Sequence, residues 1–322
     1  MKNKGWYDEM WNPMTGADRS EIRSEIRNHC NRFSGDVRLN LSFADSYEEE
    51  EPGYYVLKSP VQSPNSDKHF LIAPFGVAPT FHEYRLETPK SKYITGRTLY
   101  VNPYAETFDM PVSWIDRVMQ VIYTQRQHNY VLISGDFHEM KEYFESRPAF
   151  LLCENLWLGF RVTERTASFL PWLQIKEEKS HFFIDIDEAT NETVSMLETY
   201  VNAPGSMAHQ MEWILVGVKE DDASKNLLMR IAEIADRLSI PVFFDTEGAD
   251  LPRVLPKAFM RHTLSEKKKA MLWANCARCK VEKAKSMMYR IGWTKGRGCG
   301  MTKLGFLCEE CFAEYQKHFP FF

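Results

Sequence analysis

Four cysteines near the C-terminal end of the sequence have the spacing of a metal site. Cys276 and Cys279 form one C-x-x-C pair, Cys308 and Cys311 form a second, and 28 residues separate the pairs. Each pair sets two thiolates on a tight turn, and two such turns complete a tetrahedron of sulfur around zinc. Because the protein fills all four positions, no position stays open for water. We therefore expect a structural Zn²⁺ site rather than a catalytic one.

The other three cysteines are isolated in the sequence. Cys30 and Cys153 have the character of small buried hydrophobes, and Cys299, between two glycines, is expected in a turn, with a role as substitute metal ligand as the alternative. An odd cysteine count without an export signal favours thiols and metal over disulfides. The sequence also has no apolar run of transmembrane length. We therefore expect a cytoplasmic protein with no membrane partner.

The C-terminal segment is basic and the rest of the chain is acidic. Between Cys276 and His318 there are nine Lys or Arg and four Glu, which gives +5, so the remainder of a chain of net charge −4 carries −9. Basic and aromatic side chains here could contact phosphates and stack on a base: Arg290, Trp293, Lys295, Arg297 and Lys303. The segment thus predicts a nucleic-acid or protein partner, and a solvated basic rim with Trp293 packed under the metal site is the alternative.

The body of the chain has the pattern of an α/β fold. Apolar runs predict strands at Val37–Phe43, Thr98–Asn102, Tyr130–Ser134, Leu156–Phe160, His181–Asp187, Trp213–Val218 and Ile240–Asp245. Most are apolar on both faces, as parallel strands between two layers must be. Helical spacing occurs between them at Val112–Gln127, Glu139–Glu145, Ala189–Tyr200 and Ala223–Leu238. This alternation predicts a complete or partial (β/α) barrel of the TIM type, with functional groups after the strand carboxyl ends.

Two stretches interrupt the alternation and suggest the domain division. The acidic run Glu48–Glu51, followed by Pro52-Gly53 and a Pro- and Ser-rich stretch, predicts an inserted loop region at about 44–95. Leu251–Pro256 and the charged segment Leu264–Ala274 are expected to bridge to the C-terminal module. We therefore predict a barrel domain over residues 1–262 and a small zinc-ribbon-like module over residues 263–322.

Several blocks of the first domain, in order, resemble one family. They are Trp11-Asn12-Pro13-Met14-Thr15-Gly16, Arg27–Phe33, Pro79–Leu86, Leu99–Asn102, Pro111–Val118, His128–Tyr130, Leu156–Gly159, Trp213–Gly217 and Ile240–Phe244. The chain resembles a radical-SAM-like phage and prophage family of unknown function whose members open with W-N-P-x-T-G-C-x3-C-x2-C. The resemblance implies a radical-SAM-like barrel of phage origin, in which three cysteines ligate a [4Fe–4S] cluster.

This chain lacks the cysteines that the resemblance implies. Carried over without a gap, the three positions are Ala17, Glu21 and Ser24, and none supplies the thiolate that an iron–sulfur cluster needs. Other strand-end positions differ from the family as well: Ser134-Gly135 replaces Thr-Lys, Lys219 replaces an acid and Asp245 replaces a lysine. Glu106, after the second strand, is a milder change. We expect no [4Fe–4S] cluster and therefore no radical SAM chemistry.

Two other groups of side chains could hold a cation. Asp18, Glu21, Glu25 and His29 share helical spacing, but interleaved arginines also allow ordinary ion pairs at a helix surface: Arg19, Arg23 and Arg27. Asp185, Asp187 and Glu188 end a predicted strand at the functional edge of the barrel. They could bind a cation or a substrate amine, and an acidic strand end meeting solvent is the alternative.

Two classes of function follow from these observations. The first is a catalytically inactive, zinc-stabilised binding or regulatory protein of phage or prophage origin, a pseudoenzyme that associates with nucleic acid or protein. The second is an enzyme that modifies a nucleic acid or a nucleotide with a replaced metal cofactor. The absence of all three cluster cysteines favours the first class. The acids at Asp185 and Asp187 keep the second open.

Overall fold

The chain forms two compact units, Met1–His262 and Thr263–Phe322. The first contains the large sheet, and the second contains the two C-x-x-C pairs. The structure is a computed structural model, and it describes residues 5–19, 47–63, 66–91, 96–163, 166, 180–203, 208–217, 224–245, 251–261, 273–276, 279, 282–284, 289–293 and 303–318. The assignment of these units to a radical-SAM-like domain and a zinc-ribbon domain stays a prediction.

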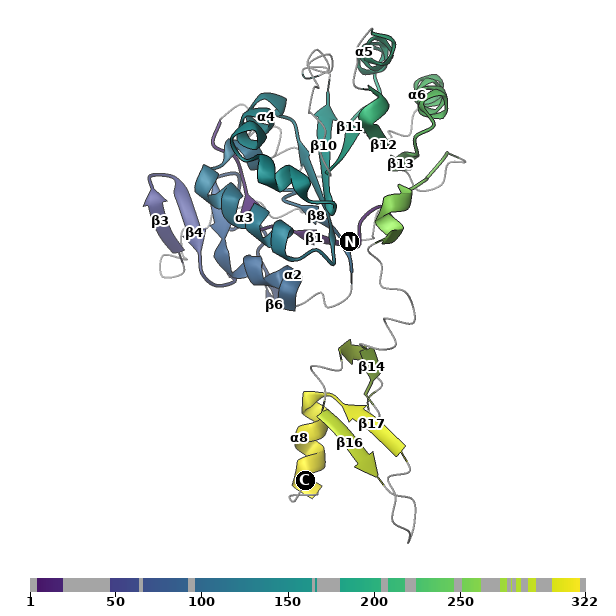
Figure 1. Ribbon diagram of the computed structural model, residues 1–322. Coiled ribbons are helices and arrows are strands. Elements are labelled where there is room, and N and C mark those ends of the chain that lie inside the picture. Colours follow the sequence, from purple (N-terminus) through teal and green to yellow (C-terminus); the bar gives the residue numbers. More distant parts are fainter. Residues whose placement is uncertain are drawn as a thin grey trace. The chain divides into compact units, whose positions relative to one another are not determined.

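The first unit is built on a curled parallel sheet of seven strands that forms half a barrel (Figure 1). The strands lie in the order β1-β8-β9-β10-β11-β12-β13, and each pairs in parallel with its neighbours. Their bounds are β1 Glu9–Trp11, β8 Thr98–Val101, β9 Asn129–Ser134, β10 Leu156–Val162, β11 His181–Ile186, β12 Met211–Gly217 and β13 Val242–Asp245. All seven carboxyl ends therefore meet at one edge, which we call the carboxyl edge.

The expectation of a mixed α/β fold with a barrel-like parallel sheet is confirmed. The apolar runs locate β8 to β13 to within a few residues. The remaining predicted strand, Val37–Phe43, lies outside the described residues, and the strand that pairs with β8 is β1. The sequence pattern does not indicate β1, because Glu9-Met10-Trp11 is too short for a periodic signal to emerge.

Amphipathic helices cover the outer face of the sheet (Figure 1). They are α3 Val112–Thr124, α4 Phe137–Ser146, α5 Asn191–Asn202 and α6 Ser224–Leu238. The described part of this unit also has short helices: η2 Glu83–Glu87, α2 Thr88–Ser91, η3 Thr107–Asp109, η4 Pro148–Leu152, η6 Ala208–Gln210 and η7 Lys257–Arg261. In α3 the buried side chains Trp114, Ile115 and Val118 share one stripe. None of the helices in the described ranges is long and apolar enough to span a membrane.

Side-chain caps fix where two of these helices begin. The Asp136 carboxylate accepts a hydrogen bond from the backbone N–H of Glu139 at 3.1 Å and caps α4. Thr190 and Thr193 form a capping box at the start of α5. Each cap satisfies backbone donors that the first helical turn leaves without partners. Both helices therefore start within a few residues of the carboxyl edge.

The concave face of the sheet is filled by aromatic side chains. They form one buried cluster with members Trp6, Tyr7, Tyr100, Trp157, Phe183, Trp213, Phe243 and Phe259. Gly159 makes room for this packing, because a Cβ at that position would lie 2.3 Å from the Phe183 ring. Inward-facing side chains recur at every second residue of a strand. The next inward positions toward the carboxyl edge are Arg161 in β10 and Asp185 in β11, where the concave face becomes charged.

The motif Trp11–Gly16 fastens the start of the chain to the sheet. The Trp11 indole donates to the Arg85 carbonyl oxygen at 2.8 Å, and the backbone N–H of Met14 donates to Asn102 Oδ1 at 3.0 Å. Gly16 follows with φ 88°, and its backbone N–H donates to the Tyr104 carbonyl at 2.7 Å. The turn at Gly16 therefore directs residues 17–19 along the carboxyl edge.

The inserted region has more regular structure than the sequence suggests. We expected a loop region, whereas its described residues form β3 Tyr47–Glu51, β4 Tyr54–Leu57, β5 Gln62–Ser63, β6 Ser66–Phe70 and β7 Thr80–His82. With β2 Met14–Thr15 they give a second sheet, in the order β2-β7-β4-β3, and a hairpin of β5 and β6. Leu57, Val61 and Phe75 are buried beneath it. The apolar residues of β4 supply a core, so the four glutamates form an exposed edge strand.

The described residues of the second unit form two antiparallel strand pairs and one helix. Its elements are β14 Trp273–Asn275, β15 Glu282–Ala284, β16 Tyr289–Trp293, β17 Lys303–Leu307 and α8 Glu309–His318. β14 pairs with β15, and β16 pairs with β17. Cys276 directly follows β14, and Cys308 lies between β17 and α8. The elements of the unit are short, and they bring the two C-x-x-C pairs together.

Gly16 and Gly53 provide a matched test of the turn. Both have φ 88°, but a Cβ at Gly16 would lie 2.2 Å from the Ala78 carbonyl oxygen, whereas a Cβ at Gly53 meets nothing within 4 Å. Gly53→Ala should lower the free energy of unfolding by about 1–2 kcal/mol through backbone strain. Gly16→Ala should cost about 1–3 kcal/mol more, because of the added overlap. Urea unfolding of both variants measures the difference, and equal losses would contradict it.

Candidate functional site

An ion pair between a partly buried arginine and a buried aspartate lies at the carboxyl edge of the sheet. Arg161 and Asp185 are register partners in β10 and β11. Arg161 Nε donates to Asp185 Oδ2 at 3.0 Å, and Arg161 Nη2 donates to Tyr100 Oη at 3.1 Å. Because Tyr100 belongs to the aromatic cluster, the ion pair lies where the apolar concave face ends. The ion pair therefore packs against the apolar side chains of the concave face.

Burial and neighbouring charges set the protonation of this pair. Asp185 is 7% exposed, and its burial raises the pKa of the carboxyl group to about 6 against the opposing effect of Arg161. Asp187 and Asp245 raise it further. For Arg161, burial disfavours the charge, but Tyr100, Asp185 and Asp187 outweigh it and raise the pKa of the guanidinium. The arginine stays a cation, while its carboxyl partner titrates close to neutral pH.

A second buried carboxyl group, Glu106, lies after β8. Glu106 is also 7% exposed, and it accepts hydrogen bonds from Ser134 Oγ at 2.5 Å and from the backbone N–H of Gly135 at 2.9 Å. Burial raises its pKa, and these two hydrogen bonds and the charge of Arg161 oppose that rise. Glu106 thus connects the loop after β8 to the loop after β9, and it interacts electrostatically with the ion pair.

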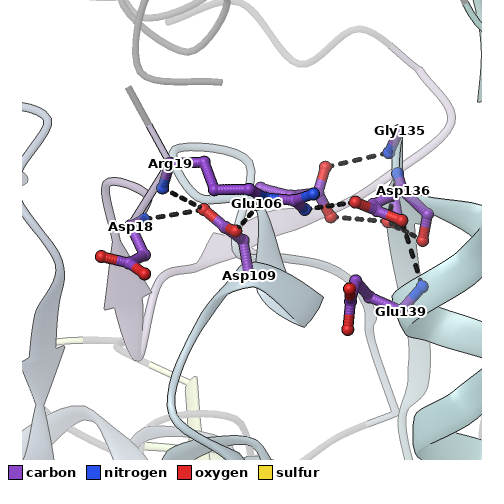
Figure 2. A network of polar contacts seen from close by, with 8 residues as sticks. Asp18, Arg19, Glu106, Asp109, Gly135, Asp136 and Glu139 are labelled. Atoms are coloured by element: carbon purple, nitrogen blue, oxygen red, sulfur yellow. Dashed lines mark hydrogen bonds and ion pairs between the residues drawn. The ribbon is translucent and has the colours of Figure 1, made fainter. Parts of the chain in front are cut away.

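Arg19 joins three segments of the chain at the same edge (Figure 2). Its Nε donates to Asp109 Oδ1 at 2.5 Å, and its Nη2 forms an ion pair with Asp136. The backbone N–H groups of Asp18 and Arg19 donate to Asp109 Oδ2 at 2.7 and 2.9 Å. Figure 2 shows Arg19 extending to Asp136 and Glu106 reaching Gly135. The guanidinium therefore fastens the N-terminal segment to the loops after β8 and β9.

The Arg161–Asp185 ion pair and the contacts of Glu106 and Arg19 form one electrostatically coupled site. Arg161 and Asp136 both influence the pKa of Glu106, although neither contacts it directly in the interactions described above. The site offers fixed guanidinium groups and two buried carboxyl groups whose pKa values are raised. Groups of this kind can bind a charged ligand, and a carboxyl group that titrates near neutral pH can also exchange a proton.

The structure places one of the three expected cluster positions and leaves two outside the described residues. Ala17 is fully buried and packs with Tyr104 in a small apolar cluster bordered by Ile72 and Val77. It has no donor atom for a metal. Glu21 and Ser24 lie outside the described residues, as do Glu25 and His29 of the alternative metal site.

The four C-terminal cysteines are brought together. One sulfur from each of Cys276, Cys279, Cys308 and Cys311 lies within 4.8 Å of the others, so the cluster could hold a metal ion. The Sγ atoms of Cys279 and Cys308 are 3.7 Å apart. Tetrahedral zinc with Zn–S bonds of about 2.3 Å would set its sulfurs about 3.8 Å apart. The donor set therefore fits a tetrathiolate metal site.

Comparison with known proteins identifies a family for most of the first unit. Residues 3–249 match the family described as Protein of unknown function (DUF5131). The chain belongs to the DUF5131 family. No curated protein and no solved structure matches the chain. The match ends before the cysteine pairs, so the metal site is a feature of this DUF5131 chain outside the matched region.

The residues predicted to contact nucleic acid are only partly described. Arg290 and Trp293 belong to β16 and Lys303 to β17, and these strands pair in antiparallel register. Lys295 and Arg297 lie outside the described residues. The strand pairing brings Trp293 and Lys303 opposite each other, since they are register partners. A nucleic-acid interface in this DUF5131 chain stays a prediction.

Sequence reasoning missed several members of the carboxyl-edge site. It identified Asp185 at a strand end, but Arg161, its partner, lies in β10 beyond the end of the predicted strand. For Arg19 the sequence pattern indicates only ion pairs at a helix surface, whereas the side chain reaches Asp109 and Asp136, 90 and 117 residues away. A useful signal in the sequence of this DUF5131 protein is the single Arg or Asp next to the last residue of β10 and of β11, since both runs are otherwise largely apolar.

The ion pair of the DUF5131 site gives stability a specific pH dependence. The folded-state pKa of Asp185, about 6, exceeds the ordinary value of 3.8. This group therefore contributes fully to stability below about pH 4 and loses that contribution as the pH rises through about 6. Asp185→Asn removes the titration, so the stability difference between wild type and variant should shift against wild type over that range. Urea unfolding from pH 4 to 7 tests this. A constant difference would contradict the prediction.

Proposed function

We propose that this protein is a zinc-stabilised binding or regulatory protein whose barrel is radical-SAM-like but catalytically inactive. The observation that carries the proposal is the environment of Ala17. The resemblance expects a cluster ligand at this position, and the residue there is buried in an apolar cluster with Tyr104. Two residues later, Arg19 ties the same segment to Asp109 and Asp136. In this proposal the ion pairs of Arg19 hold residues 17–19 in place, where the related family would use metal ligation.

The thiols of the first unit support the same conclusion. Within the described part of that unit the one cysteine is Cys153, which is buried just before β10. It therefore lies toward the amino edge of the sheet, opposite the carboxyl edge. Iron–sulfur clusters require several thiolates on the iron atoms. Cys30 adds a single thiol in the sequence, which is too few.

The carboxyl edge then serves to bind a ligand. Arg161 and Asp185 are held on an apolar floor, with Glu106 coupled to them. Buried charged groups over an apolar surface are costly to maintain, and they concentrate at functional sites. The proposed ligand is a small charged molecule, or the charged end of a larger one. The proposal of phage or prophage origin rests on the sequence resemblance alone.

In the second unit we propose that the metal is Zn²⁺. Four thiolates are a soft donor set that selects zinc among the common structural metals, and the sulfur spacing fits a tetrahedron. When bound, zinc would hold the two cysteine turns and so fold the unit. The +5 charge of the segment supports a nucleic-acid partner for this unit, and a protein partner is the alternative. A cytoplasmic location stays a prediction.

One observation favours an enzyme as the second candidate. Burial raises the pKa of Glu106 and raises that of Asp185 to about 6, and a carboxyl group with a raised pKa can act as a general acid or base. The reaction in that case would be the modification of a nucleic acid or nucleotide with a replaced cofactor. The proposed binding function requires fewer components than the enzyme, because it needs no metal beyond the zinc of the second unit.

Metal analysis of protein purified without oxygen tests the proposal. We expect one zinc per chain, no iron, and no broad visible absorption of an iron–sulfur cluster. The matched control is a Cys276→Ser/Cys279→Ser variant, which should lose the zinc. Iron near one equivalent or more, in addition to the zinc, would refute the inactive-barrel proposal. Zinc absent from the wild-type protein would refute the zinc module.

Cys308→Ser tests whether zinc acts locally. The variant should lose zinc and the folded second unit, because three thiolates hold the metal less well than four. The first unit should keep its unfolding transition, since its core lies in the half-barrel. Calorimetry with and without a chelator measures both transitions. Loss of the first unit's transition in Cys308→Ser would show that the two units fold as one.

A further inference from the structure

The four metal-site cysteines differ in their access to solvent. Cys276 and Cys308 are buried, Cys311 is partly buried, and Cys279 is exposed. A buried thiolate is shielded from solutes, so an oxidant that reaches the site meets Cys279 first. The sulfur of the exposed residue, Cys279, also lies 3.7 Å from the sulfur of Cys308. The accessible thiol thus has a second thiol within reach.

We propose that Cys279 and Cys308 are a peroxide-sensitive pair that releases the metal when oxidised. This inference rests on the proposed zinc site and adds a modification site to it. Zinc-bound cysteines are thiolates, which are the nucleophilic form of the side chain. Oxidation-sensitive cysteines are typically accessible thiolates placed next to a resolving cysteine. Cys279 is the accessible thiolate, and Cys308 is the neighbouring cysteine that can resolve it.

The chemistry takes place in two steps. The Cys279 thiolate attacks one oxygen of hydrogen peroxide, so an S–O bond forms, the O–O bond breaks and hydroxide leaves. The Cys308 thiolate then attacks the Cys279 sulfur, so an S–S bond forms, the S–O bond breaks and a second hydroxide leaves. The two sulfurs together lose two electrons, and peroxide gains them.

Oxidation removes two of the four metal ligands. Cys276 and Cys311 alone give zinc half of its tetrahedral set, so its affinity falls and the ion leaves. Each C-x-x-C pair contributes one cysteine to the disulfide and one to the remaining set. The disulfide therefore joins the two cysteine turns while the metal is lost.

The other cysteines allow a clean control. Cys153 is 3% exposed, and burial raises the pKa of its thiol to about 11, so peroxide reacts with it slowly. Cys30 and Cys299 are single thiols away from the C-x-x-C pairs in the sequence. A Cys30→Ser/Cys153→Ala/Cys299→Ser variant keeps all four metal-site cysteines. It should release zinc at the same rate as the wild-type protein.

The test uses the full chain, with its zinc content measured first. Hydrogen peroxide is added with a chromogenic zinc chelator present, and dimedone traps sulfenic acids in a parallel sample for peptide mass spectrometry. We expect release of the bound zinc in step with a Cys279–Cys308 disulfide, with dimedone on Cys279. A reductant and added zinc should restore the metal content.

Three other results would overturn the inference, and they separate it from the proposed function. Zinc that stays bound while peroxide is in excess refutes the redox pair alone. Release of zinc with the disulfide or the dimedone adduct confined to other cysteines also refutes the redox pair alone. This readout uses the wild-type chain, so it needs no cysteine substitution that could unfold the unit. A chain that binds no zinc before peroxide is added refutes the zinc module and this inference with it.

Discussion

A curled parallel sheet encloses space that its own side chains must fill, and this constraint organises the first unit. Large aromatic residues on the concave face, among them Trp157, Phe183 and Trp213, meet it. Close packing leaves little room for polar groups in the interior. Charged residues on this face therefore collect where the strands end, as Arg161 and Asp185 do. The location of the candidate site follows from how the interior is packed.

The same reasoning explains what the sequence predicts and what it does not. Strands β8 to β13 are apolar on both faces, so their composition identifies them, whereas the three residues of β1 are defined only by pairing with β8. Asp185 could be placed at a strand end from local pattern. The contacts of Arg19 with Asp109 and Asp136 could not, because they depend on how loops distant in sequence converge.

The two units have different sources of order. The first has an extensive core on the outer face of its sheet and a second on the inner face. The described part of the second has short strands and the helix α8, and it brings four cysteine sulfurs together. Small units of this kind bury little apolar surface, so the metal that we propose at the four cysteines would supply much of the stability that a core supplies elsewhere. This difference explains why the cysteine spacing was readable from the sequence, while the barrel site required the structure.

The edge strand β3 has a consequence for how the protein behaves in concentrated solution. In the part of the chain that the structure describes, β3 ends its sheet, and Glu48, Glu49, Glu50 and Glu51 are all exposed. An edge strand presents backbone groups that can add a strand from another molecule. A second copy of this chain would bring the same four carboxylates to that edge, and their mutual repulsion opposes the pairing. The glutamate run therefore opposes β-strand addition at this edge.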